Sequence, residues 1–304
     1  MAGEVLAFLL LLESATAGIV SDVRAAIARD DFSLAEGRLN AYRAQHGVTS
    51  EMLEALSWLG RGALASKQLD KADAYAAETR RLALEQLRTR KLDADKHLPL
   101  ALGASIEVQA AVLAERGQRA EAVSFLTREF KTYRATSIRA RIQKNINLLS
   151  LEGKPAPPLE IREWLGSKPL PLAELKGRTV LLFFWAHWCP DCKAQAPVLA
   201  KLQGQYAGRG LVLMGPTQHY GYVQRGREAP PEQELRYIEE VRGRSYSDLA
   251  EMPVPVSEEN FTVYGASTVP TLVLIDRQGM VRLYHPGAMS YEELAARVEV
   301  VIGR

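Results

Sequence analysis

Residues 184–197 read FWAHWCPDCKAQAP and contain both cysteines of this 304-residue chain, Cys189 and Cys192. Because the sequence has no third cysteine, these two thiols are set up to react with each other. A C-x-x-C that follows a strand and opens a helix makes one thiol a nucleophile and the other its resolver. The spacing therefore predicts a thiol–disulfide exchanger, provided that the flanking residues supply the strand and the helix.

The flanking residues predict this strand and this helix. Residues 179–186 form an unbroken apolar, β-rich run, which is typical of a strand buried on both faces. Beyond Cys189, apolar residues recur at spacings of three and four, which indicates one face of a helix. Pro190 suits the first helical turn, where a missing N–H costs little, whereas Pro197 inside the helix should kink it. The apolar face consists of Ala194, Val198, Leu199, Leu202 and Tyr206.

This geometry would place Cys189 at the N-terminus of the helix. Free main-chain N–H groups and the positive end of the helix dipole favour a thiolate there, so we expect the Cys189 pKa to lie well below that of an ordinary thiol. Cys192, one turn later, should be more buried and protonated at rest. Pro190 and Asp191, between the cysteines, should tune the pair. Asp191 opposes the dipole and leans the pair weakly toward a reductant.

Two other interpretations of the cysteine pair are weaker. A structural zinc site usually takes four protein ligands, and of the five histidines only His187 and His219 fall plausibly near, so no metal is predicted. A purely structural disulfide across two residues would close a very short loop and stabilise little. Redox exchange is the favoured interpretation, with the disulfide itself as the redox group.

The stretch around the cysteines resembles the active site of a thioredoxin fold. Within that fold it is most similar to the TlpA/ResA-like thiol–disulfide oxidoreductases, which lie close to the AhpC/TSA superfamily. A second match is Thr-Val-Pro-Thr at residues 268–271, which precedes an apolar strand, a tight turn and another strand. The resemblance covers about residues 153–304 and implies an α/β domain with a central mixed sheet flanked by helices.

The resemblance also implies roles for individual residues. Cys189 would be the attacking thiol and Cys192 the resolving thiol. Pro270 would be a cis-proline packed against the redox pair, and the Val269 backbone would pair with a strand of the substrate. Trp188 would shield the two cysteines.

Departures from the family pattern bear on the chemistry. Phe183 stands where thioredoxin carries a buried aspartate, and residues 211–214 lack the glutamate that TlpA-like proteins often place there. Proton transfer from Cys192 would then use water. His187 is a possible helper, although a histidine two residues before a cysteine is more often a solvated loop residue. Peroxidase chemistry is not expected, because residues 185–188 replace the threonine-containing run that a peroxiredoxin needs.

The segment from Gly215 to Phe261 is long for this fold. It contains an aromatic-rich stretch, arginines and a Pro-Pro pair, followed by a helix expected from Glu232 to about Arg244. Loops beside a reactive centre often carry specificity, so this segment could contact a partner protein. A surface insertion that only caps the sheet is equally compatible with the sequence.

Residues 18–150 predict helices throughout, because they are rich in Ala, Leu, Glu and Arg and carry few strand signals. Three helix–turn–helix segments resemble degenerate tetratricopeptide repeats. Their anchors, Ala35, Ala72 and Ala122, lie 37 and 50 residues apart, so the period is not kept and a generic helical bundle stays open. Either arrangement could present a groove to a protein ligand.

The length fits two domains of about 150 residues each. A semi-rigid, proline-rich linker is expected at residues 151–158, and the thioredoxin-like domain at residues 159–304. The 38 Lys and Arg residues against 36 Asp and Glu residues argue against binding to nucleic acid or to a membrane surface. With no nucleotide-binding glycine run in a suitable setting, no organic cofactor is expected, and electrons would come from an upstream redox partner protein.

Residues 1–17 hold an apolar run followed by Ser-Ala-Thr-Ala, a secretory pattern that is too short to span a bilayer. No Lys or Arg precedes the run, so a plain N-terminal helix is the alternative to a signal peptide. TlpA-like proteins are usually extracytoplasmic, and the absence of stray cysteines suits an oxidising space. We expect a periplasmic or otherwise exported protein, and a cytoplasmic one stays open.

The favoured function is that of an enzyme that exchanges disulfides in protein substrates. The reductase direction is slightly favoured, for example toward the thiols of cytochrome c apoprotein. The alternative is a non-catalytic, redox-sensing adaptor that binds partner proteins through its helical domain.

Overall fold

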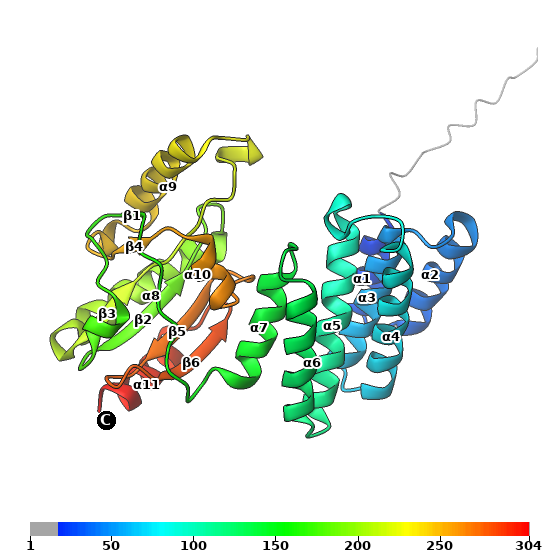
Figure 1. Cartoon of the computed structure of the whole chain (residues 1–304), viewed down its shortest axis with the longest axis horizontal. Helices are drawn as coiled ribbons and strands as arrows, with labels where there is room; N and C mark the ends of the chain where they lie inside the picture. Colours follow the sequence, from blue (N-terminus) through cyan, green and yellow to red (C-terminus); the bar gives the residue numbers. More distant parts are fainter. Residues whose placement is uncertain (1–17, 304) are drawn as a thin grey trace, which may run out of the picture. The chain divides into compact units, whose positions relative to one another are not determined.

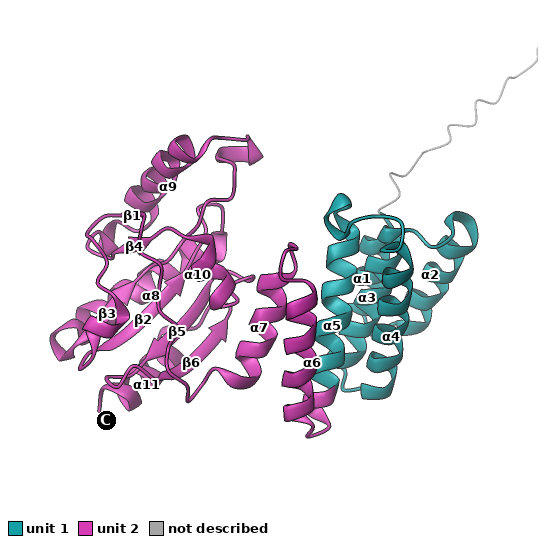
Figure 2. Ribbon diagram, viewed as in Figure 1, with its two compact units in different colours: residues 1–112 teal, residues 113–304 magenta. Residues whose placement is uncertain are grey.

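The computed structural model describes residues 18–303, and the predicted signal peptide or N-terminal helix at residues 1–17 lies outside them. The chain divides into two compact units, residues 1–112 and residues 113–304 (Figure 2). The described part of the first unit is all-helical, and the second unit combines helices with a sheet.

The helices of the first unit pack through small side chains. Ala63, Ala72 and Ala76 are buried where α3 meets α4, which lets these helices approach closely. The helical prediction is confirmed, and the tetratricopeptide assignment stays a prediction. The helices are α1 (Ile19–Ile27), α2 (Phe32–His46), α3 (Ser50–Ala65), α4 (Leu69–Gln86) and α5 (His97–Glu115), which crosses the boundary between the units, with a 3-10 helix at Leu92–Ala94.

Among the described residues, α5 is the one helix long and apolar enough to cross a membrane, judged by length and composition alone. However, 56% of its apolar 18-residue window is buried within the protein, where Val108 and Val112 pack against Ala63 and Ala72. Packing in the core of a helical unit therefore accounts for its apolar composition.

The second unit holds a four-stranded sheet with helices on both faces, and a separate two-stranded sheet (Figure 1). The strands of the larger sheet are β2 (Thr179–Phe184), β3 (Leu211–Met214), β5 (Thr271–Ile275) and β6 (Val281–Pro286), and the smaller sheet pairs β1 (Trp164–Leu165) with β4 (Val254–Pro255). The helices are α6 (Arg119–Thr132), α7 (Arg139–Ser150), α8 (Pro190–Tyr206), α9 (Pro231–Ser245), α10 (Glu258–Val263) and α11 (Tyr291–Ile302). Short 3-10 helices lie at Leu172–Leu175, Ala207–Arg209, Gln224–Gly226 and Ser247–Leu249.

The larger sheet is mixed, as the resemblance implied. Its strand order is β3-β2-β5-β6, with β2 parallel to β3 and antiparallel to β5. Phe184, the last residue of β2, lies opposite Thr271, the first residue of β5. This register brings the loop that leaves β2 toward Cys189 to the same edge as the loop that enters β5 from Pro270.

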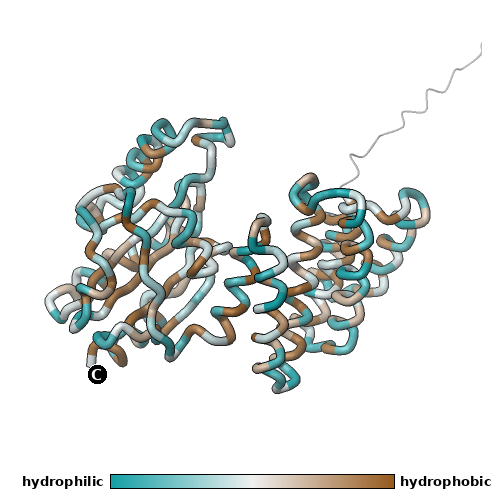
Figure 3. The backbone as a smooth tube through the Cα atoms, in the orientation of Figure 1, coloured by the Kyte–Doolittle hydropathy of each residue, from teal (hydrophilic) through white to brown (hydrophobic). Residues whose placement is uncertain are grey.

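Strand β2 forms the centre of the core. All six of its residues are buried, which confirms the predicted strand buried on both faces. Leu181 and Phe183 belong to a core that includes side chains of α8, α9 and α11, whereas Leu182 and Phe184 pack in a second core that includes α10. Figure 3 shows the central strands as largely hydrophobic and the turns at helix ends as largely hydrophilic. The sheet is thus a layer between two apolar cores.

The expected linker at residues 151–158 is packed onto the sheet. The Gly153 N–H donates to the Val281 carbonyl at 2.9 Å, and the Val281 N–H donates back to Lys154 at 2.9 Å. Helix α7 contacts α10 and β6, with Gly265 so close to α7 that a Cβ atom there would lie 2.3 Å from the Lys144 nitrogen. The compact units therefore separate at residue 112 rather than at the proline-rich segment, and the predicted domain ranges stay a prediction.

Candidate redox site

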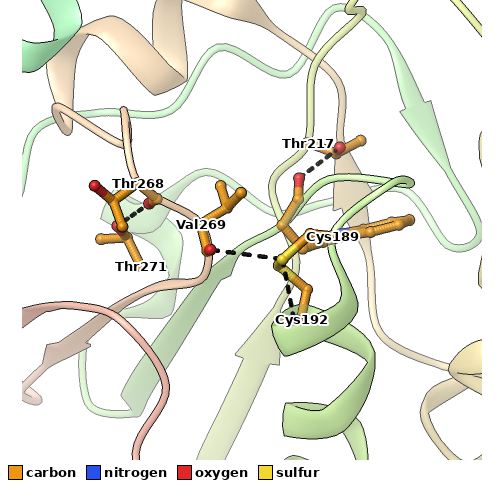
Figure 4. The surroundings of a disulfide bond; sticks show 7 residues. Cys189, Cys192, Thr217, Thr268, Val269 and Thr271 are labelled. Atoms are coloured by element: carbon orange, nitrogen blue, oxygen red, sulfur yellow. Dashed lines mark hydrogen bonds between the residues drawn. A yellow bond between two sulfur atoms is a disulfide. The ribbon is translucent and has the colours of Figure 1, made fainter. Parts of the chain in front are cut away.

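The two cysteines sit at the start of α8. Cys189 is the N-cap residue, Pro190 is the first helical residue, and Cys189 and Cys192 form a disulfide with their Cα atoms 5.3 Å apart. The Cys192 N–H points at the Cys189 Sγ atom at 3.0 Å (Figure 4). The helix start therefore aims a main-chain donor at this sulfur, as the spacing predicted. Both cysteines are buried, so the expected difference in their exposure is small: 2% for Cys189 and 0% for Cys192.

The turn that leads into Cys189 is tight. The Cys189 N–H donates to the Ala186 carbonyl at 3.1 Å, which makes His187 and Trp188 the two central residues of the turn. Trp188 is 46% exposed, and its ring meets the edge of Tyr220 at 5.6 Å between centroids. A large, half-exposed indole thus lies next to the reactive position, while Pro190 and Asp191 on its other side are exposed.

The loop before β5 forms one border of the site. The Val269–Pro270 peptide bond is cis, Val269 is half-buried and Pro270 is buried. The Val269 carbonyl oxygen lies 3.5 Å from the Cys189 Sγ atom (Figure 4). The Gly287 N–H donates to the Pro270 carbonyl at 2.8 Å, and the Thr271 hydroxyl donates to the Thr268 carbonyl at 2.7 Å. Main-chain groups and the Thr271 hydroxyl therefore define this border.

The segment after β3 supports the same turn from another direction. The Trp185 indole N–H donates to the Gly215 carbonyl at 2.9 Å, and the Trp185 N–H donates to the Pro216 carbonyl at 3.1 Å. The buried Thr217 hydroxyl donates to the Trp185 carbonyl at 2.8 Å (Figure 4). The end of β2 is therefore fixed just before the cysteines.

His187 is not a solvated loop residue, and that expectation is wrong. Its side chain is 1% exposed and meets the edges of three tyrosine rings at 5.3–5.5 Å between centroids, those of Tyr220, Tyr222 and Tyr237. Its Nε2 atom lies 3.4 Å from Glu234 Oε1, which is longer than a normal N–H···O hydrogen bond. In the described chain this nitrogen has no hydrogen-bond partner. Burial lowers the His187 pKa, the nearby Glu234 opposes this, and Lys193 adds to the lowering.

Glu234, on α9, is a functional candidate that sequence reasoning missed. It is fully buried, and its carboxylate accepts hydrogen bonds from the Tyr220 and Gly221 N–H groups at 2.6 and 2.9 Å. Its second oxygen lies 3.4 Å from His219 Nδ1, and His219 Nε2 lies 2.8 Å from Glu163. A signal existed in the sequence, because Glu234 lies four residues before the buried Ile238, on the same face of the helix.

The remaining site expectations concern proton acceptors and metals. Phe183 is buried against Tyr246, and β3 carries no carboxylate, so neither position supplies a proton acceptor for Cys192. Glu234 on α9 is a buried carboxylate that lies against His187. Within residues 18–303, no group of three or more His, Cys, Asp or Glu side chains is arranged to hold a metal ion.

Comparisons with known proteins agree with this geometry. Residues 168–302 match the family model for a thioredoxin-like domain. The chain is 25% identical over 152 residues to the thioredoxin-like protein YneN of Bacillus subtilis, covering 49% of this chain and 79% of YneN. It is 25% identical over 141 residues to the thiol-disulfide oxidoreductase ResA of Halalkalibacterium halodurans, covering 46% and 72% of the two chains. It is 29% identical over 154 residues to the thiol:disulfide interchange protein DsbE of Pseudomonas fluorescens biotype C, covering 49% and 77%.

These matches confirm the resemblance to TlpA/ResA-like proteins. Residues 168–302 form a thioredoxin-like domain, with a disulfide-forming cysteine pair at the start of α8. The chain is an oxidoreductase of the thioredoxin-like class, similar to ResA and DsbE.

Proposed function

We propose that this protein exchanges disulfides in protein substrates through Cys189 and Cys192, as its relatives' names suggest for that class. One observation carries the proposal: the Cys192 N–H lies 3.0 Å from the Cys189 sulfur at the first turn of α8. A main-chain donor and the helix dipole stabilise negative charge on that sulfur in the reduced protein. A thiolate at neutral pH is the nucleophile that exchange requires.

The exchange has two displacement steps. The Cys189 thiolate attacks one sulfur of a substrate disulfide, so a mixed disulfide forms and the other substrate sulfur leaves as a thiolate that takes up a proton. Cys192 then loses its proton and attacks the Cys189 sulfur, which releases the second substrate thiol. The substrate gains two electrons, and the Cys189–Cys192 pair is left as a disulfide. A dithiol of an upstream redox partner protein returns two electrons to this pair.

The substrate would lie across Trp188 and Val269. Val269 is half-buried beside the Cys189 sulfur, and within residues 18–303 its N–H donates no hydrogen bond, so this main-chain group is available to an extended substrate strand. Pro270, whose nitrogen has no hydrogen, keeps the next position from competing for the same acceptor. The exposed part of Trp188 adds apolar contact.

Direction and compartment follow from weaker features. Asp191 lies in the first turn of α8, where its negative charge opposes the stabilisation of a Cys189 thiolate and favours the reductase direction. The absence of further cysteines in the sequence suits an oxidising, extracytoplasmic compartment. A reduction potential of about −270 mV for the Cys189–Cys192 disulfide, measured in glutathione buffers, would support a reductant, and one of about −120 mV would support an oxidant.

Insulin reduction by dithiothreitol tests the function. Catalytic amounts of the wild-type protein should accelerate it, and Cys189→Ser should abolish the acceleration. Cys192→Ser should instead accumulate a mixed disulfide with the substrate, because the attacking thiol remains and the resolving thiol is gone. If wild type and Cys189→Ser give the same rate of insulin reduction, the enzyme hypothesis is wrong. A redox-sensing adaptor that binds partners through its helices then becomes the better explanation.

A further inference from the structure

We propose that the buried His187–Glu234 pair is a positioning and proton-holding device for the redox pair: Glu234 fixes the turn that carries Cys189, and His187 holds a proton when Cys189 is ionised. This inference rests on the proposed function. It assigns a role to α9, which lies in the long segment between β3 and α10, and to a histidine that is 1% exposed.

Contacts connect Glu234 to the turn that carries Cys189. His187 and Trp188 are the two central residues of the Ala186–Cys189 turn, so fixing their side chains fixes the approach to Cys189. The ring of Trp188 rests on Tyr220, and His187 is enclosed by Tyr220 together with two further tyrosines. Glu234 holds Tyr220 directly, by accepting its main-chain N–H at 2.6 Å. One fully buried carboxylate therefore supports both central residues of the turn.

His187 and Cys189 are close in the chain, and both are buried. Two consecutive trans peptide units place the Cα atoms of His187 and Cys189 within about 7.6 Å of each other. Both side chains are buried, at 1% and 2% exposure, so charges on them interact more strongly than charges in water. A thiolate that forms at Cys189 therefore favours the protonated form of the His187 ring.

Groups on every element around His187 act on its charge. Glu234 favours the charged ring and lies 3.4 Å away, whereas Lys193 on α8 disfavours it. Behind Glu234, His219 and Glu163 continue the chain of ionisable groups toward the surface. Two of the tyrosines that enclose the ring stay protonated, because burial raises the pKa of Tyr220 and Tyr222. The ring is therefore neutral in the oxidised protein and gains a favourable partner on reduction.

The two protons taken up on reduction can be assigned to individual groups. Reduction of the Cys189–Cys192 disulfide by a dithiol partner adds two electrons and two protons to this protein. Cys192 takes one proton as its thiol. The second proton goes to His187, and Cys189 stays a thiolate, so the reduced centre is a thiolate–imidazolium pair held against Glu234.

The direct test is a proton NMR titration of the histidine rings in the oxidised and reduced wild-type protein. The sequence has five histidines, and His187→Asn identifies the resonance by its loss. The His187 midpoint should move to higher pH on reduction. An unchanged titration midpoint in the wild-type protein would overturn the proposal, and the variant serves only to assign the resonance.

A double-mutant cycle tests the coupling to Cys189. Iodoacetamide should alkylate Cys189 of reduced His187→Asn roughly three- to tenfold more slowly than wild type at pH 6, because the thiolate loses its imidazolium partner. Glu234→Gln should also change that rate, but by less than about twofold once His187 is replaced, since the two residues act as a unit. Additive effects of the two substitutions would contradict the proposal.

Glu232→Gln is the matched control, because Glu232 lies two residues away on the same helix, carries the same charge and is exposed. In the Glu232→Gln variant, iodoacetamide should alkylate Cys189 at the wild-type rate. Insulin reduction by the wild-type protein distinguishes a failure of the proposed disulfide exchange from a failure of the role given to His187 and Glu234. If the wild-type protein does not accelerate insulin reduction, the proposed function is wrong. If it does, but the His187 titration midpoint is the same in the oxidised and reduced protein, only this inference is wrong.

Discussion

Cys189 is bordered by two segments that are built in different ways. The cis-proline segment, residues 268–271, meets the sulfur with the Val269 carbonyl and is held by main-chain hydrogen bonds. The insertion, residues 215–261, supports the same turn through the Gly215 and Pro216 carbonyls and, in addition, through three side chains, those of Thr217, Tyr220 and Glu234. A border made of backbone depends on a short local motif, whereas a border made of side chains depends on residues spread over many positions.

This difference predicts where substitutions do most harm. In the insertion, the critical group is a fully buried carboxylate that accepts two main-chain hydrogen bonds. In the cis-proline segment, the critical feature is backbone conformation, and side chains can vary more freely. Substitutions on the two sides of Cys189 can therefore test whether the two borders differ as the structure indicates.

The largest expected effect is that of Glu234→Ala. This change removes a fully buried carboxylate, and with it the acceptor of the Tyr220 and Gly221 N–H groups, and should lower the free energy of unfolding by about 3–5 kcal/mol. Urea denaturation of the oxidised protein measures it. Glu232→Ala, on the exposed face of the same helix, should change that free energy by less than about 0.5 kcal/mol. Equal midpoints for the two variants would show that the insertion is not anchored by this carboxylate.

The next largest effect tests the backbone of the cis-proline side. Gly287 has a φ angle of +118° and donates its N–H to Pro270, so Gly287→Ala forces a side chain into a strained conformation. We expect a loss of about 1–3 kcal/mol in the same urea assay. Gly208→Ala is the control, because a Cβ atom there meets nothing within 4 Å. An equally large loss of unfolding free energy for Gly208→Ala would show that the positive φ angle of Gly287 is not the cause of the effect.

The two borders were not equally predictable from sequence. Residues 179–184, the Cys-Pro-Asp-Cys turn and Pro270 all carry short-range signals, namely an apolar run, a proline at a helix start and a proline before a strand. Each of these signals lies within a few residues of the structure that it specifies. The strand and the helix start were therefore predictable from local signals, whereas the thioredoxin-like fold and the role of Pro270 were expected from the resemblance to a known family.

His187 and Glu234 were not predictable in the same way. Their burial depends on a contact between residues 47 positions apart, and each alone is of a type that is usually solvated. Gln195 is a similar case: it is buried and exchanges hydrogen bonds with the Met289 backbone, whereas Ala194, expected on the buried face of the helix, is exposed. Polar groups of this kind follow tertiary contacts rather than helical periodicity.

A pH series sharpens the comparison on the side of the insertion. Burial lowers the His187 pKa below its ordinary value of 6.5, so below about pH 6.5 the unfolded chain binds a proton that the native oxidised protein does not. The stability contributed by the neutral ring is present above that pH and is lost as the pH falls toward the lowered pKa. The unfolding free energy of oxidised His187→Asn should therefore fall less between pH 7 and pH 5 than that of wild type. Parallel curves would show that His187 titrates alike in both states.

The smallest expected effect on stability is that of Trp188→Ala, which tests the surface where the two borders meet. Its ring is 46% exposed and has an edge contact with Tyr220, so the loss should stay below about 1.5 kcal/mol. If Trp188 helps to hold substrate, KM for a protein disulfide should instead rise roughly three- to tenfold with kcat nearly unchanged. Trp164→Ala, which removes another half-exposed tryptophan on β1, should leave KM unchanged. A fall in kcat with constant KM would mean that Trp188 supports the reactive turn, as His187 does, rather than the substrate.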